Sequence, residues 1–121
     1  MSKKVLAVDD SKTMRDMVNF TLSGAGFEVI EAEDGVQALQ KLGNDKVDLI
    51  ITDVNMPNMD GITLIRELRQ NPTHKATPIL VLTTESDDDK KNAGRSAGAT
   101  GWVVKPFDPE KLIATVAKVC P

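Results

Sequence analysis

Short apolar runs recur along the chain, and polar residues end each of them. Four runs are continuous rather than alternating and rich in β-branched residues, which is typical of strands buried on both faces of a sheet; they span residues 5–8, 49–51, 79–82 and 102–104. A fifth segment, residues 27–31, partly alternates between apolar and polar residues and suits a strand near a sheet edge. The pattern therefore predicts five strands.

Between these strands, apolar residues recur at helical spacing, so that each stretch presents one apolar face. Four such faces are formed by Met14, Met17, Val18 and Leu22, by Val36, Leu39 and Leu42, by Leu64, Ile65 and Leu68, and by Leu112, Ile113, Val116 and Val119. Ser11 and Asp108, the latter followed by Pro109, stand where helix caps are useful. Residues 87–97 start with a polar run and contain small residues, which predicts a helix held only lightly on the sheet.

Strands and helices alternate five times, which implies right-handed crossovers and a parallel sheet with helices on both faces. We therefore predict an α/β fold with a doubly wound, five-stranded parallel sheet. The length of 121 residues suits one domain, which we expect to span residues 1–121. One of the common strand orders for such sheets is 2-1-3-4-5.

Composition and charge exclude several classes of function. A formal charge of −3 provides no general basic field, so we expect no nucleic-acid binding. No run approaches the roughly 20 apolar residues that a membrane-spanning helix needs, and the start of the chain does not resemble a signal peptide. We therefore expect a cytoplasmic protein without membrane insertion. Cys120 is the only cysteine and is interpreted as a reduced bystander.

The residues that end the strands carry the candidate chemistry. In an open parallel sheet, ligands bind beyond the carboxyl ends of the strands. In the order 2-1-3-4-5, the first, third, fourth and fifth strands are neighbours, and their ends would bring together Asp9, Asp10, Asp53, Thr83 and Lys105. Asp and Thr are also common in solvated loops, but four matching strand ends favour one pocket of three carboxylates, a hydroxyl and an ammonium group.

Three carboxylates in one pocket indicate a metal ion, because they raise one another's pKa unless a cation lies between them. Oxygen ligands point to Mg²⁺. A carboxylate beside Mg²⁺ can attack phosphorus and form an aspartyl phosphate, and Asp53 is the central candidate. Lys105 would pair with one phosphoryl oxygen as a point charge, and the Thr83 hydroxyl would donate to another.

These residues resemble the signature of the CheY-like receiver domains of response regulators. The resemblance rests on Asp9-Asp10, residues 53–61, Thr83 and Lys105-Pro106, and it runs from about Lys4 to the C-terminus. It implies a flavodoxin-like fold, and because CheY is the type example of the order 2-1-3-4-5, that order is taken from the family and not from the residues.

The resemblance also implies roles for individual residues. Asp53 would be phosphorylated by a histidine kinase, and Mg²⁺ would be bound by Asp10, Asp53 and the backbone carbonyl of Asn55. Asp9 would assist indirectly as the second acid. Asn55 and Glu85 would flank the pocket and influence how water reaches the acyl phosphate.

A conformational switch is implied as well. Thr83 and Trp102 would form a coupled pair whose rearrangement alters the face made by the fourth helix, the fifth strand and the fifth helix. Trp102 stands where Tyr or Phe is more usual, and the alternative is a partly buried ring without a switching role. The Lys105–Pro106 peptide bond is often cis in such domains.

Three functions follow from this pocket. The first is a chemotaxis-type messenger, a monomeric single-domain response regulator that binds a target such as the flagellar motor switch; the end at Pro121 without an output domain favours it. The second is a phosphate shuttle or sink in a phosphorelay. The third, a phosphohydrolase of the haloacid-dehalogenase type, needs an acid two residues after the nucleophile, where this chain has Asn55.

The chain is expected to receive phosphoryl groups rather than donate them. His74 is its single histidine and lies in a predicted loop with no helical face around it, so a phosphodonor role is not expected. As a signalling phosphoacceptor, the protein would catalyse only its own phosphorylation and dephosphorylation.

Overall fold

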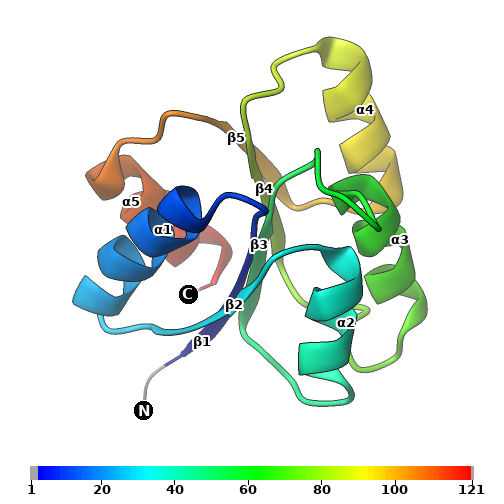
Figure 1. The fold of residues 1–121 in the computed structure, drawn as a ribbon, viewed down its shortest axis with the longest axis horizontal. Coiled ribbons are helices and arrows are strands. Elements are labelled where there is room, and N and C mark those ends of the chain that lie inside the picture. The colour runs from blue at the N-terminus through cyan, green and yellow to red at the C-terminus, as the bar shows by residue number, and fades with distance from the viewer. Residues whose placement is uncertain (1–2, 121) are drawn as a thin grey trace.

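The computed structural model describes residues 3–120, so the two ends of the predicted unit, residues 1–2 and 121, lie outside the described residues. Strands and helices alternate throughout this range (Figure 1). The strands are β1 (Lys4–Val8), β2 (Glu28–Ala32), β3 (Leu49–Thr52), β4 (Ile79–Thr83) and β5 (Gly101–Val104). The helices are α1 (Lys12–Gly24), α2 (Gly35–Leu42), α3 (Gly61–Gln70), α4 (Asp88–Ala97) and α5 (Pro109–Val119).

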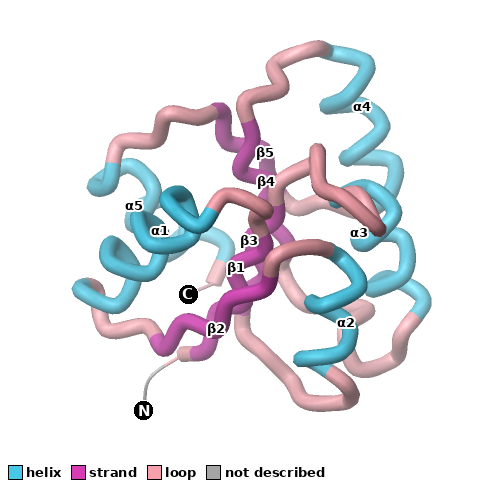
Figure 2. Tube along the Cα trace, in the orientation of Figure 1, coloured by secondary structure: helices cyan, strands magenta, loops and turns pink. Residues whose placement is uncertain are grey.

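All five strands are parallel and lie in the order β2-β1-β3-β4-β5. This confirms the predicted doubly wound α/β fold. The sheet stands between two layers of helices, with α1 and α5 on one face and α2, α3 and α4 on the other (Figures 1 and 2).

Alternate residues of β1 belong to two separate hydrophobic cores, one on each face of the sheet. Val5 and Ala7 pack with the buried face of α1 and α5, whereas Leu6 and Val8 pack on the opposite side with α2 and α3. Because both faces of the strand are buried after Lys4, residues 5–8 are continuously apolar. No helix within residues 3–120 is long and apolar enough to span a membrane.

Each helix is preceded by a capping residue, whose side chain accepts a hydrogen bond from a backbone N–H in the first turn of the helix. Ser11 and Asp108 cap α1 and α5, as predicted from the sequence. Asp34, Asp60 and Asp87 cap α2, α3 and α4 in the same way. Such caps satisfy backbone donors that would otherwise lack partners and contribute about 1 kcal/mol each. The caps thus define where each strand-to-helix loop ends.

Three details of the predicted burial were wrong. Strand β5 is only half-buried, because it lies at the sheet edge and α4 offers it little cover. Met17 and Val36 were assigned to apolar helix faces, but they are 45% and 38% exposed. Val18 and Leu22 bury the face of α1 that contacts the sheet, and Met17 points away from it.

Helix α4 is held lightly, as its composition predicted. Gly94 is its only buried residue within the described chain. At its C-terminal end, Arg69 from α3 donates hydrogen bonds to the Gly98 carbonyl oxygen from Nε at 3.0 Å and from Nη2 at 2.9 Å. The helix is therefore anchored mainly at one end.

His74 lies in the turn between α3 and β4 and is almost fully buried, with 1% exposure. Its Nε2 atom is 3.4 Å from the Gly43 carbonyl oxygen. Both residues precede strands, so they lie toward the amino ends of the sheet, opposite the candidate site. His74 therefore lies outside the candidate site.

Candidate functional site

The register of the parallel strands brings the candidate residues to one edge. Val8 of β1 pairs with Thr52 of β3, so Asp9 and Asp53 follow at the same level of the sheet. The Asp53 N–H donates to the Val8 carbonyl oxygen at 2.9 Å. On the other side, the Lys105 N–H donates to the Thr83 carbonyl oxygen at 2.8 Å, just past the last β4–β5 pair. The four strand ends therefore meet, as predicted.

Three carboxylates converge at this edge. Asp9, Asp10 and Asp53 each offer one oxygen, and these oxygens lie within 4.8 Å of one another. Asp9 and Asp53 are buried, whereas Asp10 is exposed. The cluster therefore has a closed inner side and one carboxylate that solvent reaches.

Lys105 bridges the two buried carboxylates. Its Nζ atom donates to Asp9 Oδ2 at 2.6 Å and to Asp53 Oδ2 at 3.2 Å. Burial raises the pKa of Asp9, although the hydrogen bond from Lys105 opposes this effect. Burial also acts to lower the pKa of Lys105, but the hydrogen bond to Asp9 and the attraction of both carboxylates outweigh it and raise that pKa. The lysine is thus held as an ammonium ion within the cluster.

Asp53 is oriented by the chain that follows it. Its Oδ1 atom accepts a hydrogen bond from the Val54 N–H at 2.7 Å, which turns Oδ2 toward Lys105. The Gly61 N–H then donates to the Val54 carbonyl oxygen at 2.9 Å as the chain returns to begin α3. A Cβ atom at Gly61 would collide with the Asp53 carbonyl oxygen and lie 3.0 Å from the Val54 Cα atom. Only glycine fits this close approach.

Glu85 connects the pocket to the side chains around it through three of its atoms. Its N–H donates to Thr83 Oγ1 at 3.3 Å, and its Oε1 atom accepts from Asn55 Nδ2 at 3.1 Å. Its carbonyl oxygen accepts from Trp102 Nε1 at 2.9 Å. The four residues predicted to flank the pocket or form the switch are therefore joined in one hydrogen-bonded group.

The Trp102 ring is half-buried and lies over helix α4. A Cβ atom at Gly94 would lie only 2.7 Å from Trp102 Cζ3, so the ring uses the space that glycine leaves on the helix. The ring also packs against the apolar core beneath α3 and α4. A large indole is thus accommodated in an inward position by a small residue on its neighbour.

Arg15 is a buried residue of the site that was not predicted. Its Nη1 atom donates to the Asp9 carbonyl oxygen at 2.6 Å. A signal was present in the sequence, because Arg15 precedes Val18 by three positions and Leu22 by seven and therefore shares the buried face of α1. A cation on such a face requires a buried partner.

The arrangement fits a divalent cation and phosphoryl chemistry. Three carboxylates face a single ammonium group, so the cluster keeps an excess of negative charge. Their oxygens are the ligands that Mg²⁺ prefers, and the exposed Asp10 leaves the site accessible. A carboxylate next to an ammonium group and a metal site is the arrangement that a phosphoryl acceptor needs.

A model of the response regulator receiver domain family matches residues 5–117. The chain belongs to this family. It is 43% identical over 111 residues to the chemotaxis protein CheY1 of Helicobacter pylori, with 90% of each chain covered. It is 38% identical over 119 residues to the transcriptional regulatory protein PhoP of Bacillus subtilis, where it covers 98% of its own length and 49% of PhoP. The receiver thus spans about half of that relative.

Solved structures support the same assignment. The chemotaxis response regulator CheY4 of Vibrio cholerae is 50% identical to this receiver, with a TM-score of 0.93 and coverage of 98% of this chain and 99% of that one. CheY-type receivers are signalling proteins of two-component systems. Such receivers bind Mg²⁺ through a cluster of acidic residues like the one formed here by Asp9, Asp10 and Asp53. The Lys105–Pro106 peptide bond of this receiver is cis, as the resemblance implied.

Proposed function

We propose that this receiver accepts a phosphoryl group on Asp53 in the presence of Mg²⁺. The observation that carries the proposal is the meeting of Asp9, Asp10 and Asp53 around the Lys105 ammonium group. Asp10, Asp53 and the backbone carbonyl of Asn55 would hold the metal ion, with Asp9 acting indirectly. When bound, the ion would neutralise charge on the phosphoryl oxygens.

The transfer needs few parts beyond these. A carboxylate oxygen of Asp53 forms a bond to phosphorus while the bond from phosphorus to the donor histidine nitrogen breaks, and the electron pair leaves with the nitrogen. Lys105 already contacts Asp53 Oδ2 and would move its hydrogen bond to a phosphoryl oxygen. Later attack by water would release phosphate and restore the carboxylate. Asn55 and Glu85 flank the route by which that water arrives.

Signalling would follow from the loop that contains Glu85. The Thr83 hydroxyl now accepts a hydrogen bond from the Glu85 N–H. If the hydroxyl turns to donate to a phosphoryl oxygen, it moves toward Asp53 and away from that N–H. Because the Glu85 carbonyl oxygen binds Trp102 Nε1, the change reaches the indole ring and the face formed by α4, β5 and α5.

We propose that the output is a chemotaxis-type message. Similarity to CheY1 and CheY4, which are described as chemotaxis proteins, supports this function. In it, a histidine kinase phosphorylates the receiver, a cytoplasmic monomer. The phosphorylated receiver then binds a protein target such as the flagellar motor switch through the face formed by α4, β5 and α5. A shuttle or sink in a phosphorelay would use the same pocket and return the phosphoryl group to a histidine protein.

The proposed chemistry is tested by incubating the protein with acetyl phosphate and measuring its intact mass. We expect a gain of one phosphoryl group that requires Mg²⁺, because the ion offsets the repulsion between the donor and three carboxylates. EDTA should prevent the gain. A receiver that gains no phosphoryl group from acetyl phosphate at saturating Mg²⁺ would contradict the proposal.

A second expectation concerns Trp102, the chain's only tryptophan. Phosphorylation should change its fluorescence, because the ring is hydrogen-bonded to Glu85, whose N–H would lose its bond to Thr83 when the hydroxyl turns toward the phosphoryl group. Thr83→Ala should still be phosphorylated but should lose most of the fluorescence change. Stopped-flow fluorescence and intact mass, recorded on the same samples, separate the two effects.

Thr84→Ala is the matched control, since Thr84 is exposed and follows Thr83 directly. It should retain the full fluorescence change. If Thr83→Ala keeps the same change as the parent, Trp102 is not coupled to Thr83, and the ring has only a packing role.

A further inference from the structure

The guanidinium group of Arg15 lies against the inner side of the acidic cluster. Its side chain is 10% exposed, and Nη1 donates to the Asp9 carbonyl oxygen at 2.6 Å. Arg15, Asp9 and Asp53 also line one small cavity of about 10 Å³. The arginine of α1 therefore lies next to the proposed phosphoacceptor, on the side away from solvent.

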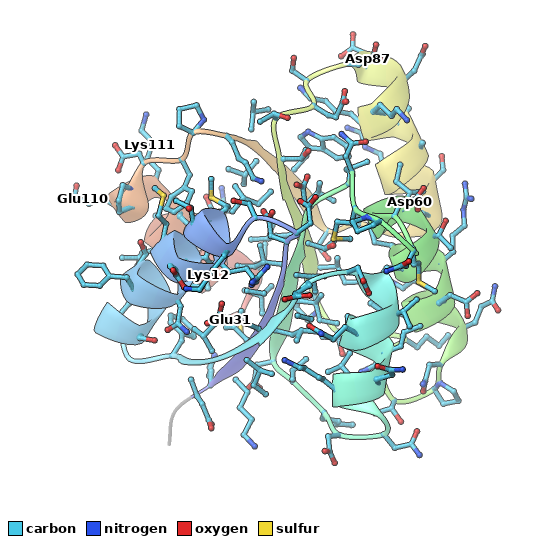
Figure 3. All side chains as sticks on the ribbon, in the orientation of Figure 1. Lys12, Glu31, Asp60, Asp87, Glu110 and Lys111 are labelled. Carbon is cyan, nitrogen blue, oxygen red and sulfur yellow. The ribbon has the colours of Figure 1, made fainter. Side chains whose placement is uncertain are left out.

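The remaining nitrogens of Arg15 face two carboxylates at the end of β2. Nε lies 3.4 Å from Glu31 Oε1, and Nη2 lies 3.8 Å from Glu33 Oε1. Glu31 is itself held, because its Oε2 atom accepts a hydrogen bond from Asn19 Nδ2 at 2.9 Å. Figure 3 shows Glu31 beside α1, and its two carboxylate oxygens contact Arg15 and Asn19 of that helix.

A planar guanidinium group that donates one hydrogen bond to the Asp9 carbonyl oxygen and pairs with two carboxylates has a defined orientation, which a lysine ammonium group cannot reproduce. Arginine also stays charged in proteins, so its burial depends on these partners. The contacts therefore hold the Asp9 carbonyl oxygen in a fixed direction relative to α1 and β2.

That carbonyl oxygen controls Asp10 through the peptide bond. The Asp9 carbonyl group and the Asp10 N–H belong to one planar unit, so fixing the first fixes the second. Asp9 is held further by its N–H, which donates to the Ala32 carbonyl oxygen at 3.1 Å, and by Oδ1, which accepts from the Ser11 N–H at 2.9 Å. Within residues 3–120, no group donates a hydrogen bond to the Asp10 carboxylate. Its place beside Asp53 therefore depends on the backbone, which sets the direction of the Asp10 Cα–Cβ bond.

We infer that Arg15, supported by Glu31, is a positioning residue that orients the Asp9–Asp10 peptide so that the Asp10 carboxylate faces Asp53 and binds Mg²⁺. The inference rests on the proposed function and adds a residue of α1 to the same site. It concerns geometry and not the charge of Arg15, since a buried cation would by itself disfavour a metal ion nearby.

A positioning role and a purely electrostatic role of Arg15 predict different Mg²⁺ affinities for two substitutions. Arg15→Met removes a positive charge, so a purely electrostatic role predicts tighter Mg²⁺ binding. Arg15→Lys keeps the charge, so the same role predicts no change. If Arg15 positions the peptide, both variants should bind Mg²⁺ more weakly by roughly tenfold, as is usual when a residue that orients a metal ligand is lost.

The measurement is calorimetric titration of Mg²⁺ into each variant without a phosphodonor, with the folded state checked by circular dichroism. Arg66→Lys is the control, because Arg66 lies on the exposed side of α3 and should leave the affinity unchanged. Unchanged affinity in Arg15→Lys, or tighter binding in Arg15→Met, would overturn the inference. A parent protein that binds no Mg²⁺ would instead contradict the proposed function.

Glu31→Gln provides a test if the Arg15 variants do not fold. It removes the carboxylate that holds Arg15 but leaves Asp9 and Asp10 intact. Glu28→Gln, at the exposed start of the same strand, removes an equal charge from a residue that is not an ion-pair partner of Arg15. A clear loss of Mg²⁺ affinity in Glu31→Gln alone supports positioning by Arg15, whereas equal affinities in the two variants exclude it.

Discussion

Asp53→Asn should abolish the Mg²⁺-dependent gain of a phosphoryl group. The amide lacks the nucleophilic charge of a carboxylate and is a poor ligand for a hard cation. The fold should persist, because an amide oxygen can still accept the hydrogen bond from the Val54 N–H. Lys105 also keeps its 2.6 Å contact with Asp9. Intact mass after incubation with acetyl phosphate measures the loss, and thermal unfolding measures the stability.

The stability of this variant should equal or exceed that of the parent when no metal ion is bound. One of three neighbouring carboxylates is removed, which relieves repulsion within the cluster. Asp45→Asn is the matched control, since Asp45 is exposed and lies outside the site. It should be phosphorylated like the parent. A phosphoryl group on Asp53→Asn would show that another residue is the acceptor.

Gly61→Ala should destabilise the protein and impair phosphorylation together. The added Cβ atom would collide with the Asp53 carbonyl oxygen and lie 2.9 Å from its carbonyl carbon. These are backbone atoms of the segment that carries the phosphoacceptor, so they cannot move away as a side chain would. Overpacking of this kind costs about 1–3 kcal/mol in the free energy of unfolding. Urea unfolding and the rate of phosphorylation by acetyl phosphate are the two measurements.

Gly24→Ala gives the opposite expectation with the same change of residue. Gly24 ends α1, and apart from its chain neighbours and the backbone of α1 itself, no atom lies within 4 Å of the position where a Cβ would stand. Alanine there should leave the stability unchanged or raise it by up to about 1 kcal/mol, because it restricts the unfolded chain. If Gly61→Ala is as stable as Gly24→Ala and is phosphorylated normally, the close approach at Asp53 has no functional importance.

The fold and the location of the site were predictable from simple features of the chain. Continuous apolar runs identified the strands, and the polar residues that end them identified Asp9, Asp53, Thr83 and Lys105. The carboxyl ends of parallel strands lie at the same edge of a sheet. A residue's position at the end of a strand is therefore enough to predict that it lies near the others. The strand order came from the resemblance to a family, and the catalytic and metal-binding roles of these residues stay predictions.

Contacts that depend on tertiary structure were not predictable in the same way. The hydrogen bond from Arg15 to the Asp9 carbonyl oxygen requires the angle at which α1 packs on β1. Two of the three hydrogen bonds of Glu85 are made by its backbone N–H and carbonyl oxygen. The residue type does not determine the partners of backbone atoms. The half-exposure of β5 depends on how much of the strand α4 covers, whereas a run of apolar residues reports only local preference.

The uneven anchoring of α4 has a mechanical consequence. Arg69 holds the Gly98 end, Trp102 supports Gly94 about one turn before that end, and the Asp87 end is exposed to solvent. If the indole ring shifted, the helix would turn about its Gly98 end, because the contact with Trp102 lies close to that end. A small displacement of the indole ring would therefore become a larger displacement at the far tip. Because this helix buries so little, such pivoting costs less free energy than moving any other helix of the layer.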